Sequence, residues 1–342
     1  MQLLIIGQAE NILKIINIKL KAFLVILNFL IYYFLCINKK DSLKIPISFI
    51  FFLLSFIFFL LVDFSKMPDY QEYYAVIGLE GKGQSFNTLF SEPYYFQIVN
   101  YFNLSLSKEA SINVFYFTNT LLTTSFFLWL SFKDDISPWK KVFLYSMYYY
   151  LFSFVLLRNT PSYILLATSF YYLNYKRIFF PSLFTFLCHI SSLPVIIFSF
   201  FKNKYANILL IFICLGYIFL FNVLTKLEIF GIYEKLTIYK DDNQYGQGVF
   251  HKIYFYLFIF LNLILLFFKK DIILNYTYVL IFLTYIFLQF IGPVMGFRFS
   301  IYLIFYLLMT NTYNRIEKNN FYKNILSFFT IVILFYNYLQ LF

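Results

Sequence analysis

Residues 148–172 read YYYLFSFVLLRNTPSYILLATSFYY, and residues 287–308 read FLQFIGPVMGFRFSIYLIFYLL. Both stretches are apolar over a membrane-spanning length, yet each contains one arginine, Arg158 or Arg298. An ionisable side chain at membrane depth costs free energy and usually faces a protein cavity, so both arginines are candidate functional residues. Two permanently charged, fork-shaped donors favour an anionic ligand such as a phosphate.

Composition predicts an integral membrane protein. Of the 342 residues, 61% are hydrophobic and 13% are charged, and the mean hydropathy is +0.74. The apolar residues come in blocks of bilayer length, which argues against a water-soluble globular protein. The formal net charge of +11 needs no nucleic acid, because polytopic membrane proteins collect Lys and Arg in cytoplasmic loops. The three cysteines lie in apolar runs without metal-ligand spacing, so we expect no metal site and no cofactor.

The apolar blocks predict an all-α, polytopic fold with about 10–12 transmembrane helices in a single domain, residues 1–342. The expected spans lie near 20–37, 45–62, 111–132, 142–157, 160–175, 207–224, 253–268, 272–290, 297–312 and 325–342. Two gaps, 63–110 and 225–252, are far longer than simple connections, and we expect them to be large external loops.

The charge distribution sets the predicted orientation. Six short gaps hold fifteen Lys and Arg against five acids: 38–44, 133–141, 176–177, 202–206, 269–271 and 313–324. Placing these gaps in the cytoplasm gives +10 inside and +1 outside, in agreement with the positive-inside rule. Lys14, Lys19 and Lys21 then fall on the outer side, which an interfacial N-terminal helix or a later true start would explain.

Residues 178–201 are the segment that this orientation constrains most. The gaps on either side share one face only if the segment enters the membrane and returns, and about 24 residues are too few for two full spans at ~1.5 Å per residue. We therefore expect a re-entrant or broken hairpin with His189 at its tip, between Pro181 and Pro194. A single span is the alternative, and it would place Arg298 on the cytoplasmic side.

The first long loop carries the densest polar chemistry. Asp69, Tyr70 and Tyr74 precede a Glu92-Pro93 step that opens an amphipathic stretch. Carboxylates accept hydrogen bonds from sugar hydroxyls, while aromatic rings cover the apolar faces of pyranoses. An interfacial aromatic belt explains the tyrosines equally well, and a helix-start acid explains Glu92.

These features recur in an ordered set of short motifs. They are Asp-Tyr-x-x-x-Tyr from Asp69, Glu-Pro at Glu92, Arg-Asn-x-x-Ser-Tyr from Arg158, Cys-His-x-Ser-Ser-Leu around His189, and Gly-Phe-Arg-Phe-Ser-x-Tyr around Arg298. In this order and position, they resemble the EpsG/Wzy family of bacterial polysaccharide (O-antigen) polymerases over residues 20–312. The resemblance implies a fold like that of lipid-linked-sugar (GT-C-like) transferases.

The resemblance also implies a metal-independent glycosyltransferase. Its donor would be a glycan on undecaprenyl diphosphate, and its acceptor a lipid-linked repeat unit at the periplasmic face of the bacterial inner membrane. Attack at the anomeric carbon expels a diphosphate, which Arg158 and Arg298 would bind. A general base would be His189, Asp69 or Glu92, in that order. Residues expected to contact sugar or acceptor are Tyr70, Tyr74, Tyr245 and Tyr302.

Other readings of the sequence stay open. An O-antigen ligase shares the donor chemistry and differs in its acceptor, whereas a lipid-linked oligosaccharide flippase needs alternating access and usually two related halves. His189 could be a hydrogen-bonding residue of the hairpin turn, and His251, in the second long loop, an interfacial side chain. Expected partners are the lipid-linked repeat unit, membrane lipid, and a chain-length regulator and flippase of the same pathway, with no nucleic acid.

Overall fold

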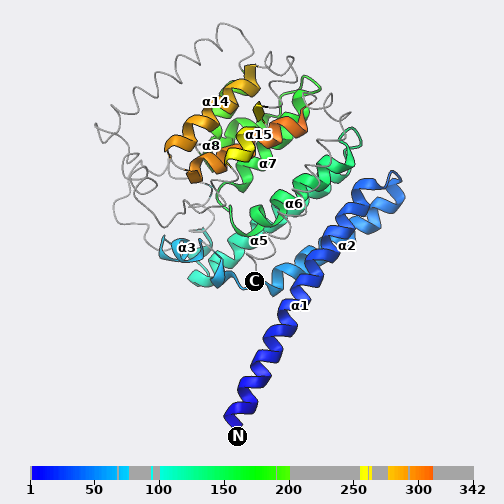
Figure 1. Cartoon of the computed structure of the whole chain (residues 1–342), viewed down its shortest axis with the longest axis vertical. Helices are drawn as coiled ribbons and strands as arrows, with labels where there is room; N and C mark the ends of the chain where they lie inside the picture. Colours follow the sequence, from blue (N-terminus) through cyan, green and yellow to red (C-terminus); the bar gives the residue numbers. More distant parts are fainter. Residues whose placement is uncertain are drawn as a thin grey trace, which may run out of the picture. The chain divides into compact units, whose positions relative to one another are not determined.

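The computed structural model describes residues 2–67, 69–76, 94, 101–189, 191–200, 255–260, 262–263, 276–291 and 293–310. Within these ranges the chain forms α-helices and short 3-10 helices and no strand, so the all-α prediction is confirmed for this part of the chain (Figure 1). Contacts divide the chain into two compact units. The first is Met1–Lys82, Tyr95–Pro161 and Ile316–Phe342, and the second is Gly83–Tyr94 and Ser162–Arg315. The single membrane domain stays a prediction.

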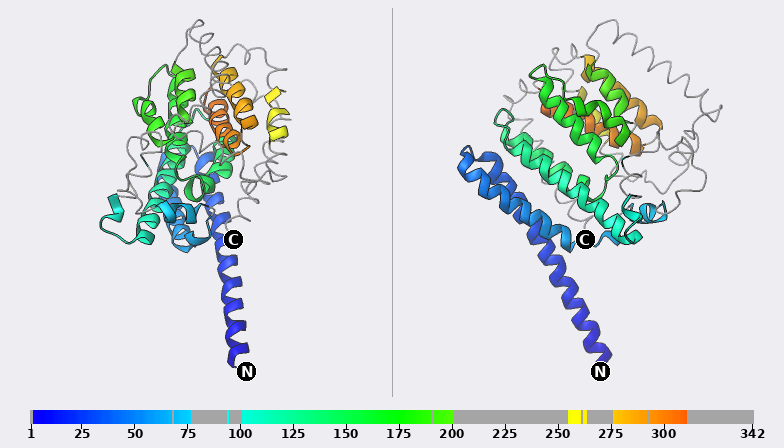
Figure 2. Two further views of the ribbon diagram at one scale, coloured as in Figure 1. Left: turned by 90° about the vertical axis from the view of Figure 1, so that its left-hand side faces the viewer. Right: turned by 180° about the vertical axis from the view of Figure 1, so that it is seen from behind.

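The first unit contains four long helices. Its elements are α1 (Gln2–Ile37), α2 (Asp41–Leu61), η1 (Phe64–Lys66), α3 (Tyr70–Val76), α5 (Lys108–Ser131) and α6 (Pro138–Phe154). Helices α1 and α2 run side by side in both Figure 1 and Figure 2, and α5 packs on α6. Both α1 and α2 also contact the α5–α6 pair. The first predicted span lies within α1, which continues it as one helix toward the N-terminus.

An aromatic core holds these four helices together. Tyr32 of α1 stacks on Tyr145 of α6 with ring centroids 4.3 Å apart, and both rings are fully buried. Phe51 of α2 and Phe127 of α5 pack against the same Tyr145 ring at 5.9 and 5.5 Å. Each of the four helices therefore gives at least one ring to a single cluster, and such ring contacts add stability beyond the apolar area they bury.

In the residues that the structure describes, the second unit contains shorter helical elements. They are α7 (Thr160–Leu173, which begins two residues before the unit boundary), η3 (Phe180–Phe184), α8 (Thr185–Cys188), α9 (Ser192–Phe200), α14 (Tyr276–Ile291) and α15 (Pro293–Met309). Helix α14 packs extensively on α15 and also contacts α9. The connection between α14 and α15 is very short, so they form a tight helical hairpin.

Gly296 allows α14 and α15 to approach closely. A Cβ atom at Gly296 would lie 2.9 Å from the Cα of Gln289 and would also clash with the Gln289 side chain. The side chain could move, whereas the backbone of α14 could not without separating the two helices. A glycine is therefore required here by packing.

Helix α7 ends in a cap that has a lysine where the backbone conformation favours glycine. The Arg177 N–H donates to the Tyr172 carbonyl (3.2 Å) and the Lys176 N–H to the Leu173 carbonyl (3.0 Å), the two bonds of a Schellman cap. Lys176 takes the left-handed position with φ of 55°, where glycine is favoured. A lysine there costs conformational energy and adds a cation to a gap predicted to be cytoplasmic.

The segment 178–201 is not one continuous helix. Elements η3 and α8 cover 180–188, the chain is extended at His189 (φ −159°, ψ 127°), and α9 begins at Ser192. The interruption falls at the predicted tip. Entry and exit on one face of a membrane stay a prediction.

Two described helical segments, Lys19–Ile37 and Asp41–Leu61, are long and apolar enough to cross a membrane. A buried helix of a soluble protein or a signal sequence can meet the same criterion, so this number is weak support for a polytopic protein. Thr277–Gln289 and Gly296–Met309 are apolar but shorter. The predicted spans 207–224 and 325–342 and the loop 225–252 lie outside the described residues, as does half of each of the segments 253–268 and 63–110.

We expect Gly296→Ala to destabilise the α14–α15 hairpin, because the added methyl group meets the backbone of Gln289. The cost of such overpacking is about 1–3 kcal/mol. Thermal unfolding of the detergent-solubilised protein would measure it. Leu283→Ala, at an exposed position of α14, is the control and should change stability less. Equal effects of the two changes would contradict the packing role.

Candidate functional site

A chain of side-chain hydrogen bonds lies within the second unit. The hydroxyl oxygens of Ser162 and Tyr302 are 2.9 Å apart, and those of Tyr302 and Ser191 are 3.2 Å apart. Ser191 Oγ in turn lies 2.6 Å from Nδ1 of His189. The chain thus joins three segments, α7, α15 and the break between α8 and α9, that are far apart in the sequence.

Helices α7 and α15, which carry Ser162 and Tyr302, run parallel to each other. The Tyr163 hydroxyl donates to the Arg298 carbonyl oxygen (3.0 Å) near the start of both helices. Further along, Phe170 packs edge-on against Tyr306, with centroids 5.2 Å apart. At the far end the Asn174 side-chain amide donates to the Met309 carbonyl oxygen (2.8 Å). These three contacts follow one another in the same order along both helices, so the helices are parallel and their register is fixed.

Tyr302 occupies the centre of the cluster. Its side chain is fully buried, and its ring packs against Tyr163 at 4.7 Å and Phe299 at 5.6 Å. Its hydroxyl bonds to two serines of the protein itself. The sugar contact expected for Tyr302 stays a prediction, while the observed contacts are internal.

The break at His189 is built from hydrogen bonds to that residue. The Ser192 hydroxyl donates to the His189 carbonyl oxygen at 2.8 Å, and the Ser191 N–H donates to His189 Nδ1 at 3.2 Å. His189 therefore accepts through both its main chain and its ring, next to the start of α9. The ring is half-buried.

Arg298 lies on α15, one helical turn before Tyr302, and its side chain is half-buried. Its carbonyl oxygen is the acceptor for Tyr163, so the main chain at Arg298 is anchored to α7. Anchoring of the backbone restricts where the guanidinium group can reach, which suits an arginine that binds a ligand at a defined position.

Arg158 lies in the first unit, in the turn after α6. The Thr160 hydroxyl bonds to the carbonyl oxygens of Phe152 and Leu156, both at 2.9 Å, and these bonds hold the turn. The guanidinium carbon of Arg158 stands 5.6 Å from the centre of the Tyr73 ring. A guanidinium group over a tyrosine face is held by cation–π attraction, which orients it without removing its charge.

Helix α3 presents its tyrosines on two faces. Tyr73 is buried, 3% exposed, and packs edge-on against Phe115 of α5 at 5.8 Å. Tyr70 and Tyr74, four residues apart, stack at 6.2 Å on the other face, where Lys108 Nζ lies 5.6 Å from the Tyr74 ring. Burial and the Glu109 carboxylate raise the pKa of Tyr70, so its hydroxyl stays a neutral donor at physiological pH.

Asp69 adjoins this group and is half-buried at the start of α3. Tyr70, Tyr74 and Asp69 therefore offer rings and a carboxylate together. The remaining predicted site residues, Glu92 and Tyr245, lie outside the described residues, as does His251. Within the described ranges, no group of three or more His, Cys, Asp or Glu side chains could hold a metal ion.

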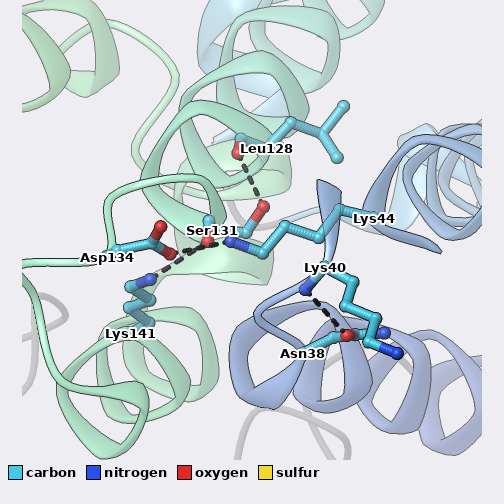
Figure 3. Close-up of polar contacts among 7 residues, drawn as sticks. All are labelled: Asn38, Lys40, Lys44, Leu128, Ser131, Asp134 and Lys141. Carbon is cyan, nitrogen blue, oxygen red and sulfur yellow. Dashed lines mark hydrogen bonds and ion pairs between the residues drawn. The ribbon is translucent and has the colours of Figure 1, made fainter. Parts of the chain in front are cut away.

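A second polar cluster joins α2 to the α5–α6 connection (Figure 3). Lys44 Nζ bonds to the Asp134 carboxylate at 2.8 Å, and Lys141 Nζ donates to the Ser131 carbonyl oxygen at 3.0 Å. Lys44 is only 1% exposed while the Asp134 side chain is 72% exposed. The hydrogen bond from Lys44 lowers the pKa of Asp134. This cluster links gaps 38–44 and 133–141, which the charge distribution places on the same side.

Sequence reasoning assigned no role to Tyr73 or Ser162. Helical spacing could have distinguished Tyr73, because in a helix Tyr73 lies away from the face shared by Tyr70 and Tyr74. Ser162 stands four residues after Arg158 within a quoted motif, but the sequence alone does not show that it faces Tyr302.

Compared with known proteins, the chain matches no family model, no curated protein and no solved structure.

We expect Asp134→Asn to destabilise the protein at neutral pH, since it leaves the Lys44 ammonium buried without its carboxylate partner. Because the folded-state pKa of Asp134 is lowered, the ion pair stabilises the protein above the ordinary Asp pKa. That contribution disappears as the pH falls through the lowered value. Asp134 is largely exposed, so we expect a difference of about 1 kcal/mol or less between wild type and variant. Thermal unfolding at a series of pH values would measure it.

Lys44→Met provides the matched test of this ion pair. It removes the buried charge at similar volume and should be neutral or stabilising. In the Lys44→Met background, Asp134→Asn should have almost no effect. An equal effect of Asp134→Asn in both backgrounds would show that the Lys44 contact does not contribute.

The stacking of Arg158 on Tyr73 predicts different outcomes for two changes at Tyr73. Tyr73→Phe keeps the ring face and should preserve the cation–π contact, whereas Tyr73→Leu removes it at a cost of about 0.5–2 kcal/mol. In the Tyr73→Leu background, Arg158→Lys should then cost less stability than in wild type. Chemical or thermal unfolding of the four proteins would give the coupling. Strict additivity would contradict the contact.

Proposed function

We propose that the protein is a bacterial surface-polysaccharide polymerase of the inner membrane. It transfers a glycan from undecaprenyl diphosphate to a lipid-linked repeat unit at the periplasmic face. One observation carries the proposal: residues of three motifs that define the family resemblance contact one another in the second unit. Ser162 and Tyr163 come from the Arg-Asn motif, Ser191 from the Cys-His motif, and Arg298 and Tyr302 from the Gly-Phe-Arg motif.

Motifs that form one shared site must lie close together in the fold, and residues of these three motifs do. Ser162 and Tyr302 are 140 positions apart in the chain, and Ser191 and Tyr302 are 111 positions apart. Short motifs that matched by chance would have no reason to meet through their motif side chains. In an apolar interior, hydroxyl groups bond to one another because an unsatisfied group would be costly.

Exposed apolar side chains support a membrane location. In α1 and α2, Phe23, Ile45, Phe49 and Leu60 are each at least 58% exposed. Large contiguous apolar surfaces of this kind are unfavourable in water and are expected where lipid covers them. The parallel course of α7 and α15 also agrees with the predicted orientation, in which both run from the periplasmic to the cytoplasmic face.

The chemistry needs few protein groups. The bond between the anomeric carbon and the diphosphate oxygen breaks, and a bond to the acceptor hydroxyl oxygen forms. The electron pair of the broken bond stays on the diphosphate, whose negative charge Arg158 and Arg298 bind through paired N–H donors. The acceptor proton goes to a base, for which His189, Asp69 and Glu92 are the candidates.

A strain lacking this protein would test the assignment. The lipopolysaccharide of such a strain should carry a single repeat unit on its core, because unpolymerised units are still exported and attached. A bare core would instead indicate the O-antigen ligase or the flippase. Complementation with the wild-type protein should restore the ladder of long chains.

We expect Arg158→Lys and Arg298→Lys each to slow polymerisation about ten- to a hundredfold. Lysine keeps the charge but loses the planar fork, and a lost hydrogen bond to a charged group costs about 1.5–3 kcal/mol. Polymer length in complemented strains and turnover of synthetic lipid-linked repeat unit would both report it, at normal protein levels. Full chain length in both variants would remove the diphosphate-binding role, and loss of the protein from the membrane would show a structural one.

A further inference from the structure

The hydrogen bonds at His189 specify which ring nitrogen carries hydrogen. The backbone N–H of Ser191 points at Nδ1 and donates to it at 3.2 Å. A nitrogen that accepts a hydrogen bond must present its lone pair, so Nδ1 carries no hydrogen. The ring hydrogen of neutral imidazole then lies on Nε2. A serine hydroxyl can rotate to donate or accept, but a backbone amide can only donate, so the amide favours the tautomer in which Nδ1 shares its lone pair between the Ser191 N–H and hydroxyl.

The same argument sets the donor-to-acceptor direction of every hydrogen bond in the series from Ser162 to His189. Since Nδ1 accepts, the Ser191 hydroxyl donates to it across 2.6 Å, and Ser191 Oγ then accepts from the Tyr302 hydroxyl across 3.2 Å. Tyr302 in turn accepts from Ser162 across 2.9 Å. Ser191 and Tyr302 then each donate once and accept once, and all donors point toward His189. Aligned hydrogen bonds polarise one another, so the chain holds the ring more firmly than its last member alone.

We propose that His189 is a hydrogen-bond donor, acting through Nε2–H on an oxygen of the leaving diphosphate, and that Ser191 and Tyr302 are positioning residues that maintain this tautomer. The inference rests on the proposed function for the identity of the ligand. A general base acting through Nε2 would need that nitrogen without hydrogen, and the Ser191 amide opposes the required tautomer. The acceptor proton therefore goes to a carboxylate, for which Asp69 and Glu92 are the candidates.

A donor at this position suits the leaving group. The diphosphate gains negative charge as the anomeric bond breaks, and a donor fixed in advance stabilises that charge without reorganising. The main chain of half-buried His189 is held by the Ser192 hydroxyl and its ring by Ser191, whose Oγ bonds in turn to Tyr302. Tyr302 itself is fully buried, so its hydroxyl acts through Ser191.

The tautomer can be measured without any assay of activity. The chain contains two histidines, so His251→Gln leaves His189 as the single signal in protein labelled with nitrogen-15 histidine. At neutral pH we expect a pyrrole-like signal for Nε2 and a pyridine-like signal for Nδ1. Tyr302→Phe, which removes the bridging hydroxyl but keeps the ring, should increase the alternative tautomer or the exchange between the two. Tyr163→Phe is the matched control, because it removes a neighbouring tyrosine hydroxyl whose bond is to the Arg298 carbonyl oxygen.

Substitutions at His189 separate a donor from a base and from a purely structural cap. In His189→Asn the amide oxygen takes the place of Nδ1 and can accept from Ser191, but nothing replaces Nε2–H. In His189→Gln the amide nitrogen reaches the place of Nε2 and can donate. A donor role therefore predicts that Gln retains measurable turnover, whereas Asn folds normally and loses about a hundredfold or more.

The possible results are distinguishable. A pyridine-like Nε2 at neutral pH overturns the inference, whatever the enzyme does. Loss of activity in both His189→Gln and His189→Asn, at normal abundance, restores the base role, and near wild-type activity of His189→Asn shows a structural cap. If the wild-type protein does not elongate synthetic lipid-linked repeat units, the proposed function fails, while the tautomer measurement still decides the geometry. Turnover that follows the order wild type, Gln, Asn supports the donor.

Discussion

The buried hydroxyl of Tyr302 is the constraint on which the second unit depends. Burying a hydroxyl group without a hydrogen-bond partner costs free energy, and Tyr302 avoids that cost through Ser162 on one side and Ser191 on the other. Its bonds therefore fix where α7, α15 and the α8–α9 break lie relative to one another. Between helices with apolar surfaces, packing alone allows sliding and rotation, whereas a directed bond between two hydroxyls selects one register. The parallel contacts from Tyr163 to Asn174 follow from that register.

The sequence predicted helices better than it predicted the site. Blocks of apolar residues show where α2, α5 and α15 lie, because a helix is the structure that satisfies its own backbone in an apolar setting. The break at His189 was also foreseeable, since charge placed both flanks on one side and the segment is short. Tyr73 could not be assigned in the same way, because its partner Arg158 lies 85 positions along the chain and no local pattern connects them. The direction of the bonds at His189 depends on one backbone N–H and has no sequence signal at all.

Charged residues show where orientation takes precedence over local stability. Lys176 occupies a left-handed position that glycine would fill at lower cost, and Lys44 is buried with a single exposed carboxylate beside it. Neither placement is what helix capping or core packing would select. Both lysines belong to gaps that carry the positive charge of the predicted cytoplasmic side. The predicted orientation in a membrane would account for cations that stability alone would remove.

The contacts among motif residues also change what the motifs mean. Tyr302, a predicted sugar contact, bonds to Ser162 and Ser191 within the protein. Part of the ordered pattern therefore encodes internal geometry. The Arg158 guanidinium lies over the Tyr73 ring, and the main chain at Arg298 is anchored to Tyr163. These bonds concern how the three segments pack against one another, and a ligand contact at any of the motif residues stays a prediction.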